Sequence, residues 1–77
     1  MKDAEILEWI AENNPKIKTH FVPLNPCRKD CNYHSFLKHE HSGSRFVIDA
    51  YGVTPEKALR NVVEKAAIKI PQIVDLL

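Results

Sequence analysis

The chain has 77 residues, 44% of them hydrophobic, and a formal net charge of +1 with neutral histidines. This length fits one domain, residues 1–77, and the apolar share is typical of a folded core rather than of a disordered segment. The small net charge argues against a strong attraction to nucleic acid or anionic membranes. No apolar run reaches the ~18 residues of a membrane span, and the first residues lack a secretory signal. We therefore expect one small cytoplasmic domain with no membrane partner.

The first predicted element is a helix over Asp3–Asn13, with Asp3 as its candidate cap. Its apolar stripe is formed by Ile6, Leu7 and Ile10. Asn13 and Asn14 tolerate a left-handed cap and Pro15 cannot continue the helix, so the helix is expected to end there. The next segment, Lys16–Val22, alternates and predicts a strand. One parity holds Ile17, Thr19 and Phe21, and the other holds Lys18, His20 and Val22.

The middle of the chain predicts a loop followed by a hairpin. Two prolines make residues 23–30 a loop. The segment Asn32–Glu40 contains aromatic residues that favour a strand, but its histidines and lysines blur the alternation, so a strand and an ordered loop both remain open. Gly43 suits a hairpin turn because it adopts positive φ without strain. Arg45–Tyr51 then predicts the clearest strand.

The last third of the chain predicts a helix with a well-defined start. Thr54 is a candidate N-cap, Pro55 fits the first helical position, and Glu56 complements the helix dipole. The apolar face consists of Leu59, Val62, Val63, Ala66 and Ile70. Pro71 is expected to interrupt the helix near Ile70, with the apolar tail adding a short final turn. The predicted fold is therefore α+β, in the order α-β-β-β-α, with a three-stranded antiparallel sheet and two helices packed on one face.

The order and size of these elements resemble the double-stranded-RNA-binding domain. The outline of that family's last helix is matched by Gly52, Thr54, Lys57, Ala58, Val62, Val63, Ala66 and Ala67. This resemblance implies contact with RNA phosphates at the start of the last helix, where Lys57 stands beside Glu56 and Leu59. Residues 52–59 are also similar to the strand-to-helix segment of HicB-like antitoxins, and the same region is similar to small phage α-β-α sandwich proteins.

The segment from Cys27 to His41 gathers side chains that bind zinc. If residues 32–40 form a strand, His34 points away from His39 and His41. The feasible ligand set is then His20, Cys27, Cys31 and His34. The alternative is that the cysteines are loop thiols, paired or free, and that the histidines are solvated. We expect no cofactor apart from this zinc.

Neither a catalytic triad nor a phosphate-binding glycine loop is present, so we expect neither enzymatic activity nor a small-molecule substrate. Our leading hypothesis is a non-catalytic protein-binding or regulatory module, a homodimer or a phage or bacterial accessory protein. Its candidate contacts are Trp9, Tyr33, Phe36, Ile73, Val74, Leu76 and Leu77. The alternatives are a nucleic-acid-binding module and a zinc-stabilised domain. The candidate nucleic-acid contacts are Arg28, Lys29, Lys38, Arg45 and Lys57.

Overall fold

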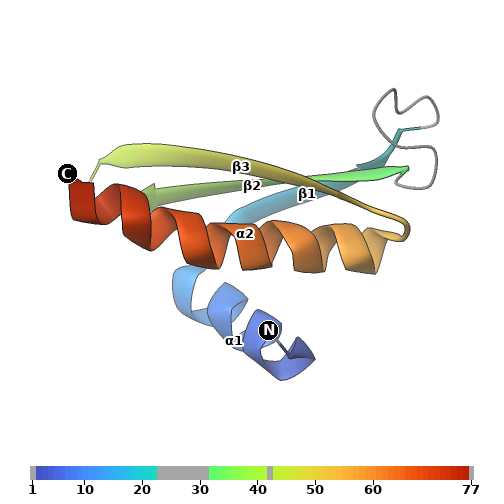
Figure 1. Ribbon diagram of the computed structural model, residues 1–77, viewed down its shortest axis with the longest axis horizontal. Helices are drawn as coiled ribbons and strands as arrows, with labels where there is room; N and C mark the ends of the chain where they lie inside the picture. The colour runs from blue at the N-terminus through green and yellow to red at the C-terminus, as the bar shows by residue number, and fades with distance from the viewer. Residues whose placement is uncertain (1, 23–31, 42, 77) are drawn as a thin grey trace.

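The computed structural model describes residues 2–22, 32–41 and 43–76. Its elements are α1 (Asp3–Asn13), β1 (Lys16–Phe21), β2 (Tyr33–His41), β3 (Ser44–Gly52) and α2 (Pro55–Leu76). The strands form one antiparallel sheet in the order β1-β2-β3. The long helix α2 crosses one face of the sheet, and α1 packs against α2 on the same side (Figure 1). This arrangement confirms the predicted α+β fold.

The sequence predicted the C-terminal end of α1 correctly but not its N-terminal cap. Asn14 has a left-handed backbone (φ 46°, ψ 51°), and its N–H donates to the Ile10 carbonyl at 2.8 Å, as expected of asparagine at this position. The expected cap, Asp3, is instead the first helical residue. The cap is Lys2, whose backbone N–H donates to Glu5 Oε1 at 3.2 Å. Asp3 lies in the first turn, and its carboxylate accepts a hydrogen bond from Arg60 of α2 at 2.6 Å.

The segment that the sequence left open, Asn32–Glu40, forms the central strand β2. It pairs on one side with β1, from Lys16↔Lys38 to Phe21↔Tyr33. On the other side it pairs with β3, from Tyr33↔Gly52 to His41↔Ser44. Pairing on both sides satisfies its backbone groups and overrides the irregular side-chain pattern. Gly43 has φ 82° in the turn between β2 and β3, as predicted.

The core lies between the sheet and α2. Leu37 of β2 and Val62 of α2 are fully buried, and Phe46 and Ile48 of β3 are 8% and 7% exposed. The predicted apolar face of α2 is confirmed, since Val62, Val63, Ala66 and Ile70 are buried and Leu59 is half-buried. The predicted cap is also confirmed, because the Lys57 N–H donates to Thr54 Oγ1 at 3.1 Å.

The expected interruption at Pro71 is wrong. The helix α2 continues through this residue to Leu76. A proline inside a helix removes one backbone donor and crowds one carbonyl, which costs ~3 kcal/mol but leaves the following turns able to form. Within the described residues, no helix is both long enough and apolar enough to cross a membrane.

Candidate binding face of the sheet

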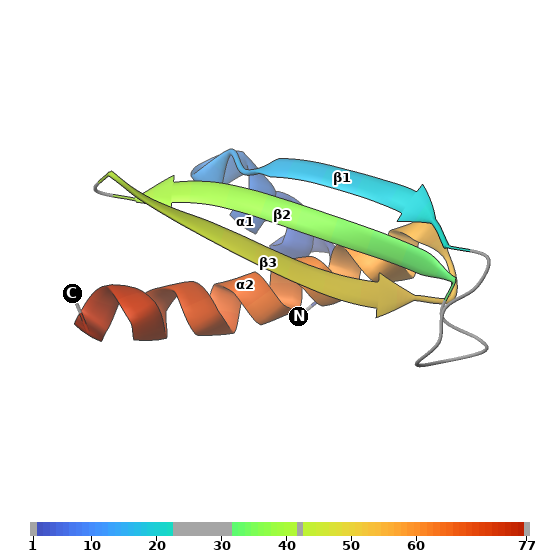
Figure 2. The same cartoon turned by 90° about the horizontal axis from the view of Figure 1, so that it is seen from above.

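The strand register assigns each described side chain of the sheet to one of two faces. Leu37 and Ile48 are register partners and both are buried under α2. Residues one position away from them therefore point to the opposite side. We call this side the open face, and Figure 2 views the sheet from it, with α2 behind. Its members are Lys16, Lys18 and His20 of β1, His34, Phe36, Lys38 and Glu40 of β2, and Arg45, Val47, Asp49 and Tyr51 of β3.

Four rings of the open face form a cluster around His34, which is only 8% exposed. The His34 ring stacks on Tyr51, with centroids 4.3 Å apart and an interplanar angle of 16°. It meets Phe36 edge-on at 4.0 Å and His20 edge-on at 5.3 Å. His20 in turn stacks on Phe36 at 5.4 Å and 16°. The cluster therefore buries a histidine on the side of the sheet that has no helix, and it leaves the outer ring faces toward solvent.

A hydrogen bond holds the orientation of the His34 ring. Its Nε2 lies 2.8 Å from Asp49 Oδ2 on the neighbouring strand. This hydrogen bond lowers the pKa of Asp49 below its usual value, burial opposes the shift, and the charge of Lys65 adds to it. Lys65 reaches this position from α2, with its Nζ 3.0 Å from the Asp49 carbonyl oxygen and 4.0 Å from Oδ1. One carboxylate oxygen of Asp49 is thus hydrogen-bonded to His34, and the other lies within ion-pair distance of Lys65.

Three exposed lysines lie on the open face next to this cluster. Lys16 and Lys18 come from β1, and Lys38 comes from β2 directly opposite Lys16. Together with Phe36 and Val47 they line an open hollow of about 560 Å³. The structure records no ion pair for these lysines with any residue that it describes. The hollow thus combines an apolar floor with a positively charged rim.

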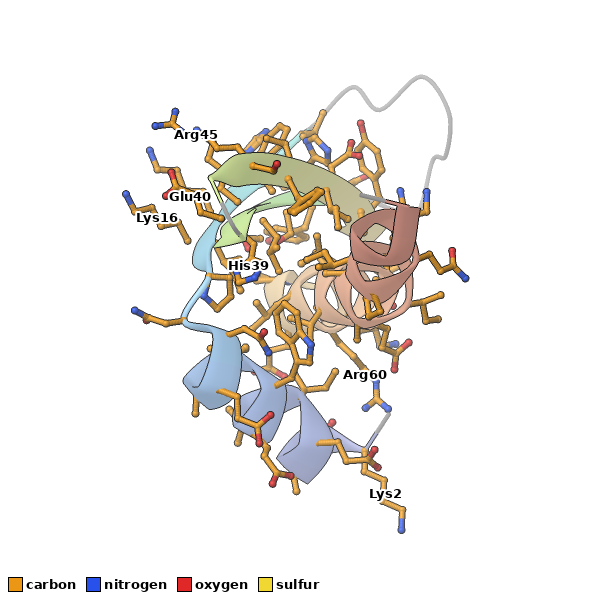
Figure 3. The ribbon with its side chains drawn as sticks, turned by 90° about the vertical axis from the view of Figure 1, so that its left-hand side faces the viewer. Lys2, Lys16, His39, Glu40, Arg45 and Arg60 are labelled. Carbon is orange, nitrogen blue, oxygen red and sulfur yellow. The ribbon has the colours of Figure 1, made fainter. Side chains whose placement is uncertain are left out.

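The end of the sheet beside the Gly43 turn carries a charge pair. Arg45 Nε donates to Glu40 Oε1 at 2.9 Å, and both side chains are largely exposed. An exposed pair of this kind contributes little stability, but it neutralises the carboxylate that β2 places at this end of the open face. Figure 3 shows Lys16, Glu40 and Arg45 gathered clear of the helices, whereas His39 lies on the helix side.

The acidic residues of the chain are concentrated on α1. This helix contains four carboxylates and no basic residue, namely Asp3, Glu5, Glu8 and Glu12. Because α1 lies on the helix side of the sheet, the acidic helix and the lysines of the open face occupy opposite sides of the molecule (Figure 1). The net charge of +1 is therefore an average over a basic face and an acidic face.

The predicted zinc ligands are only partly placed. His20 and His34 are neighbours on the open face, as the set requires, and His34 and His39 lie on opposite faces, as predicted. Cys27 and Cys31 lie outside the described residues. His34 Nε2 is already bonded to Asp49. Across residues 2–22, 32–41 and 43–76, no three His, Cys, Asp or Glu side chains are grouped to hold a metal ion.

The residues predicted to contact nucleic acid do not form one patch. Lys38 and Arg45 lie on the open face. Lys57 is in the first turn of α2, which follows Gly52 at the opposite end of β3. Arg28 and Lys29 lie outside the described residues.

The predicted partner contacts are also dispersed. Phe36 is half-buried on the open face. Trp9 is half-buried, packs against the core and has its ring 6.3 Å from that of His39. Tyr33 is half-buried on the helix side, next to Phe21. The side chains of Ile73, Val74 and Leu76 are outside the described part of the chain, as is Leu77.

The open face contains residues that the sequence analysis did not select. Lys16 and Lys18 join Lys38, while Asp49 and Tyr51 join His34. The signal was present, since these residues lie on the polar parity of their strands. This pattern identifies a single site only when the strand register shows which of these residues lie side by side.

The open face offers two kinds of group suited to binding. The rings offer stacking surfaces and the lysines offer cations. The aliphatic hydroxyls of Thr19 and Ser35 lie on the helix side and hydrogen-bond to each other at 3.0 Å, whereas His34 and Asp49 lie on the open face. Comparisons of the chain with family models, curated proteins and solved structures gave no match.

Proposed function

We propose that this domain is a non-catalytic binding module whose open face binds single-stranded nucleic acid. The observation that carries the proposal is the hollow formed by Lys16, Lys18 and Lys38 around Phe36 and Val47. A phosphate backbone supplies the negative charges that these lysines lack among their described neighbours. An unstacked base supplies a flat apolar surface for the exposed rings.

The geometry of the open face suits a single strand of nucleic acid rather than a duplex. Neighbouring β-strands lie about 4.8 Å apart, so the lysines of β1 and β2 lie close beside the rings of the same face. Single-stranded binders combine such a basic groove with aromatic platforms. The acidic α1 supports a defined orientation, because it repels the phosphates from the opposite side of the domain.

The test is fluorescence anisotropy with labelled single-stranded DNA and RNA of ~12 nucleotides, titrated at several salt concentrations. We expect binding at low salt that weakens as salt rises. Replacing Lys16, Lys18 and Lys38 with glutamine should lower the slope of log affinity against log salt by about 2, since each phosphate contact on a single strand contributes about 0.7. Phe36→Leu keeps an apolar side chain but removes the ring, and should weaken binding about tenfold.

The matched control is a triple glutamine variant with the same change in net charge. It replaces the exposed lysines Lys2, Lys57 and Lys69, which lie off the open face. The control should keep the wild-type affinity and salt slope. Equal losses of affinity in both triple variants would show that binding depends on net charge and not on the position of the lysines. The absence of binding at low salt to both oligonucleotides would refute the proposal.

Contact with a protein is the second candidate function. One observation favours it: Phe21 is 55% exposed at the margin of the sheet, on the side where the other large apolar residues of the strands are covered by helices. A partner at this margin would cover Phe21 and leave the open face accessible to nucleic acid.

A further inference from the structure

The two edge strands of the sheet, β3 and β1, differ in whether side chains bond to their outward-pointing backbone groups. On β3, two of the carbonyl groups that point away from β2 accept hydrogen bonds from side chains of α2. Asn61 Nδ2 donates to the Tyr51 carbonyl at 2.8 Å, and Lys65 Nζ donates to the Asp49 carbonyl at 3.0 Å. An edge whose acceptors are occupied in this way resists pairing with another strand.

The β1 edge has no such cover among the described residues. The Val22 N–H donates to the Asn32 carbonyl at 2.5 Å, which continues the β1–β2 register. Since backbone groups in an antiparallel pair point alternately toward and away from the partner strand, Ile17, Thr19 and Phe21 present their N–H and C=O groups outward. No backbone or side-chain group in the described part of the chain bonds to them there.

The helices leave this edge accessible. The helix α2 packs most closely on β3, and α1 packs against α2 rather than along β1. Figure 2 shows β1 at the outer margin of the sheet, with α2 crossing behind the sheet from beside β3 to the end of β1. A further strand can therefore lie beside β1 and extend the sheet.

We infer that the β1 edge pairs with the β1 edge of a second copy of this chain, in an antiparallel register centred on Thr19. The inference deepens the second candidate function and does not depend on nucleic-acid binding. In this register Ile17 lies opposite Phe21 of the second copy and Thr19 lies opposite its own equivalent. All the outward groups of Ile17, Thr19 and Phe21 are then paired, with two hydrogen bonds for each pair of residues.

Neighbouring registers fit less well. Centring on Lys18 places two lysines side by side and sets Phe21 opposite Pro15, which has no N–H to donate. Centring on His20 sets Ile17 opposite Pro23, with the same loss. The Thr19 register instead packs the exposed Phe21 against an apolar Ile17 and places Lys18 opposite His20 on the open face. It also joins two open faces into one continuous surface.

The test is the molar mass of the purified chain by light scattering over a range of concentrations, combined with amide hydrogen exchange. A contact of six residues per copy is small, so we expect a reversible dimer in the micromolar range. In the dimer, the amides of Ile17, Thr19 and Phe21 should exchange slowly. On dilution to the monomer they should exchange freely, while the Lys18 amide stays protected by β2 in both states.

Two variants make the test specific. Phe21→Lys should raise the dimer dissociation constant about tenfold or more, because it places a cation where Ile17 of the second copy packs. Ile68→Lys makes a similar change at a side chain of α2 that is 63% exposed and lies outside both the β1 edge and the open face, and it should leave dimerisation unchanged. Both variants are checked for folding by circular dichroism.

A monomer at every concentration, or a dimer whose Ile17, Thr19 and Phe21 amides still exchange freely, would overturn the inference. If the chain is monomeric but these amides become protected on adding an extended peptide, the edge serves a foreign strand, and the second copy is equally excluded. Nucleic-acid binding is measured separately by anisotropy, so its failure is distinguishable from failure of the dimer.

Discussion

Replacing Gly52 with alanine should destabilise the domain because of lost space rather than lost backbone freedom. A Cβ at Gly52 would lie 2.7 Å from the Lys57 carbonyl carbon and 2.8 Å from the Ala58 Cα, and closer still to the Ala58 nitrogen. Ordinary contacts begin at 3.4 Å, and these atoms belong to the backbone of α2. The helix would have to move away from β3 where Ala58 is fully buried. Overpacking costs 1–3 kcal/mol, and for an immobile neighbour we expect about 3 kcal/mol.

That loss is large for a domain of this size, whose total stability is expected at about 4–12 kcal/mol. It corresponds to a decrease in melting temperature of about 12–24 °C. Gly43→Ala is the matched comparison, because Gly43 has φ 82° and no atom lies within 4 Å of the position that its Cβ would take. It should cost about 1 kcal/mol for the left-handed backbone alone. Urea unfolding followed by circular dichroism measures both variants. A free energy of unfolding of Gly52→Ala within about 1 kcal/mol of the wild-type value would contradict this prediction. A larger loss of stability for Gly43→Ala than for Gly52→Ala would contradict it as well.

Two further substitutions test the two faces of the sheet. Leu37→Ala removes a fully buried side chain and should cost about 2–5 kcal/mol in urea unfolding, whereas Val47→Ala on the open face should stay within about 0.5 kcal/mol. Equal costs would contradict the assignment of faces. Asp49→Asn should destabilise by at most about 1 kcal/mol at pH 7, since the Asp49 side chain is half-exposed. The lowered pKa means that this stabilisation is present above the usual aspartate value of about 3.9 and is lost as pH falls through the folded value. The free energies of unfolding of the wild type and of Asp49→Asn should therefore converge below about pH 4. A difference between them that stays constant down to about pH 2 would exclude the proposed role of the His34 hydrogen bond.

The local signals that the sequence predicted are those whose cause lies within a few residues. The Thr54 cap, the left-handed Asn14 and the positive φ of Gly43 each depend on the chemistry of one side chain and its nearest backbone. The extent of β2 depends on distant residues. Its alternation is blurred because His34 and Phe36 are covered by rings of β1 and β3 on the open face, while Leu37 is covered by α2.

The candidate site was predictable only in part, because it is made by the register. The sequence placed Lys16 and Lys18 on the polar side of a strand, but nothing local indicates that Lys16 lies opposite Lys38. The net charge also concealed the site, because the carboxylates of α1 cancel in the total while lying on the other side of the molecule. Charge counted along a chain is thus a weak guide to the field at one face.

The central claim is that the open face binds single-stranded nucleic acid, and mapping the contact by NMR tests it most directly. Isotope-labelled protein is titrated at low salt with an unlabelled single strand of ~12 nucleotides. The account predicts amide shifts concentrated around Lys18, Phe36 and Val47, with Ala66 on the covered face of α2 unaffected. Shifts centred on the first turn of α2 around Lys57, or no shifts at saturating oligonucleotide, would contradict it.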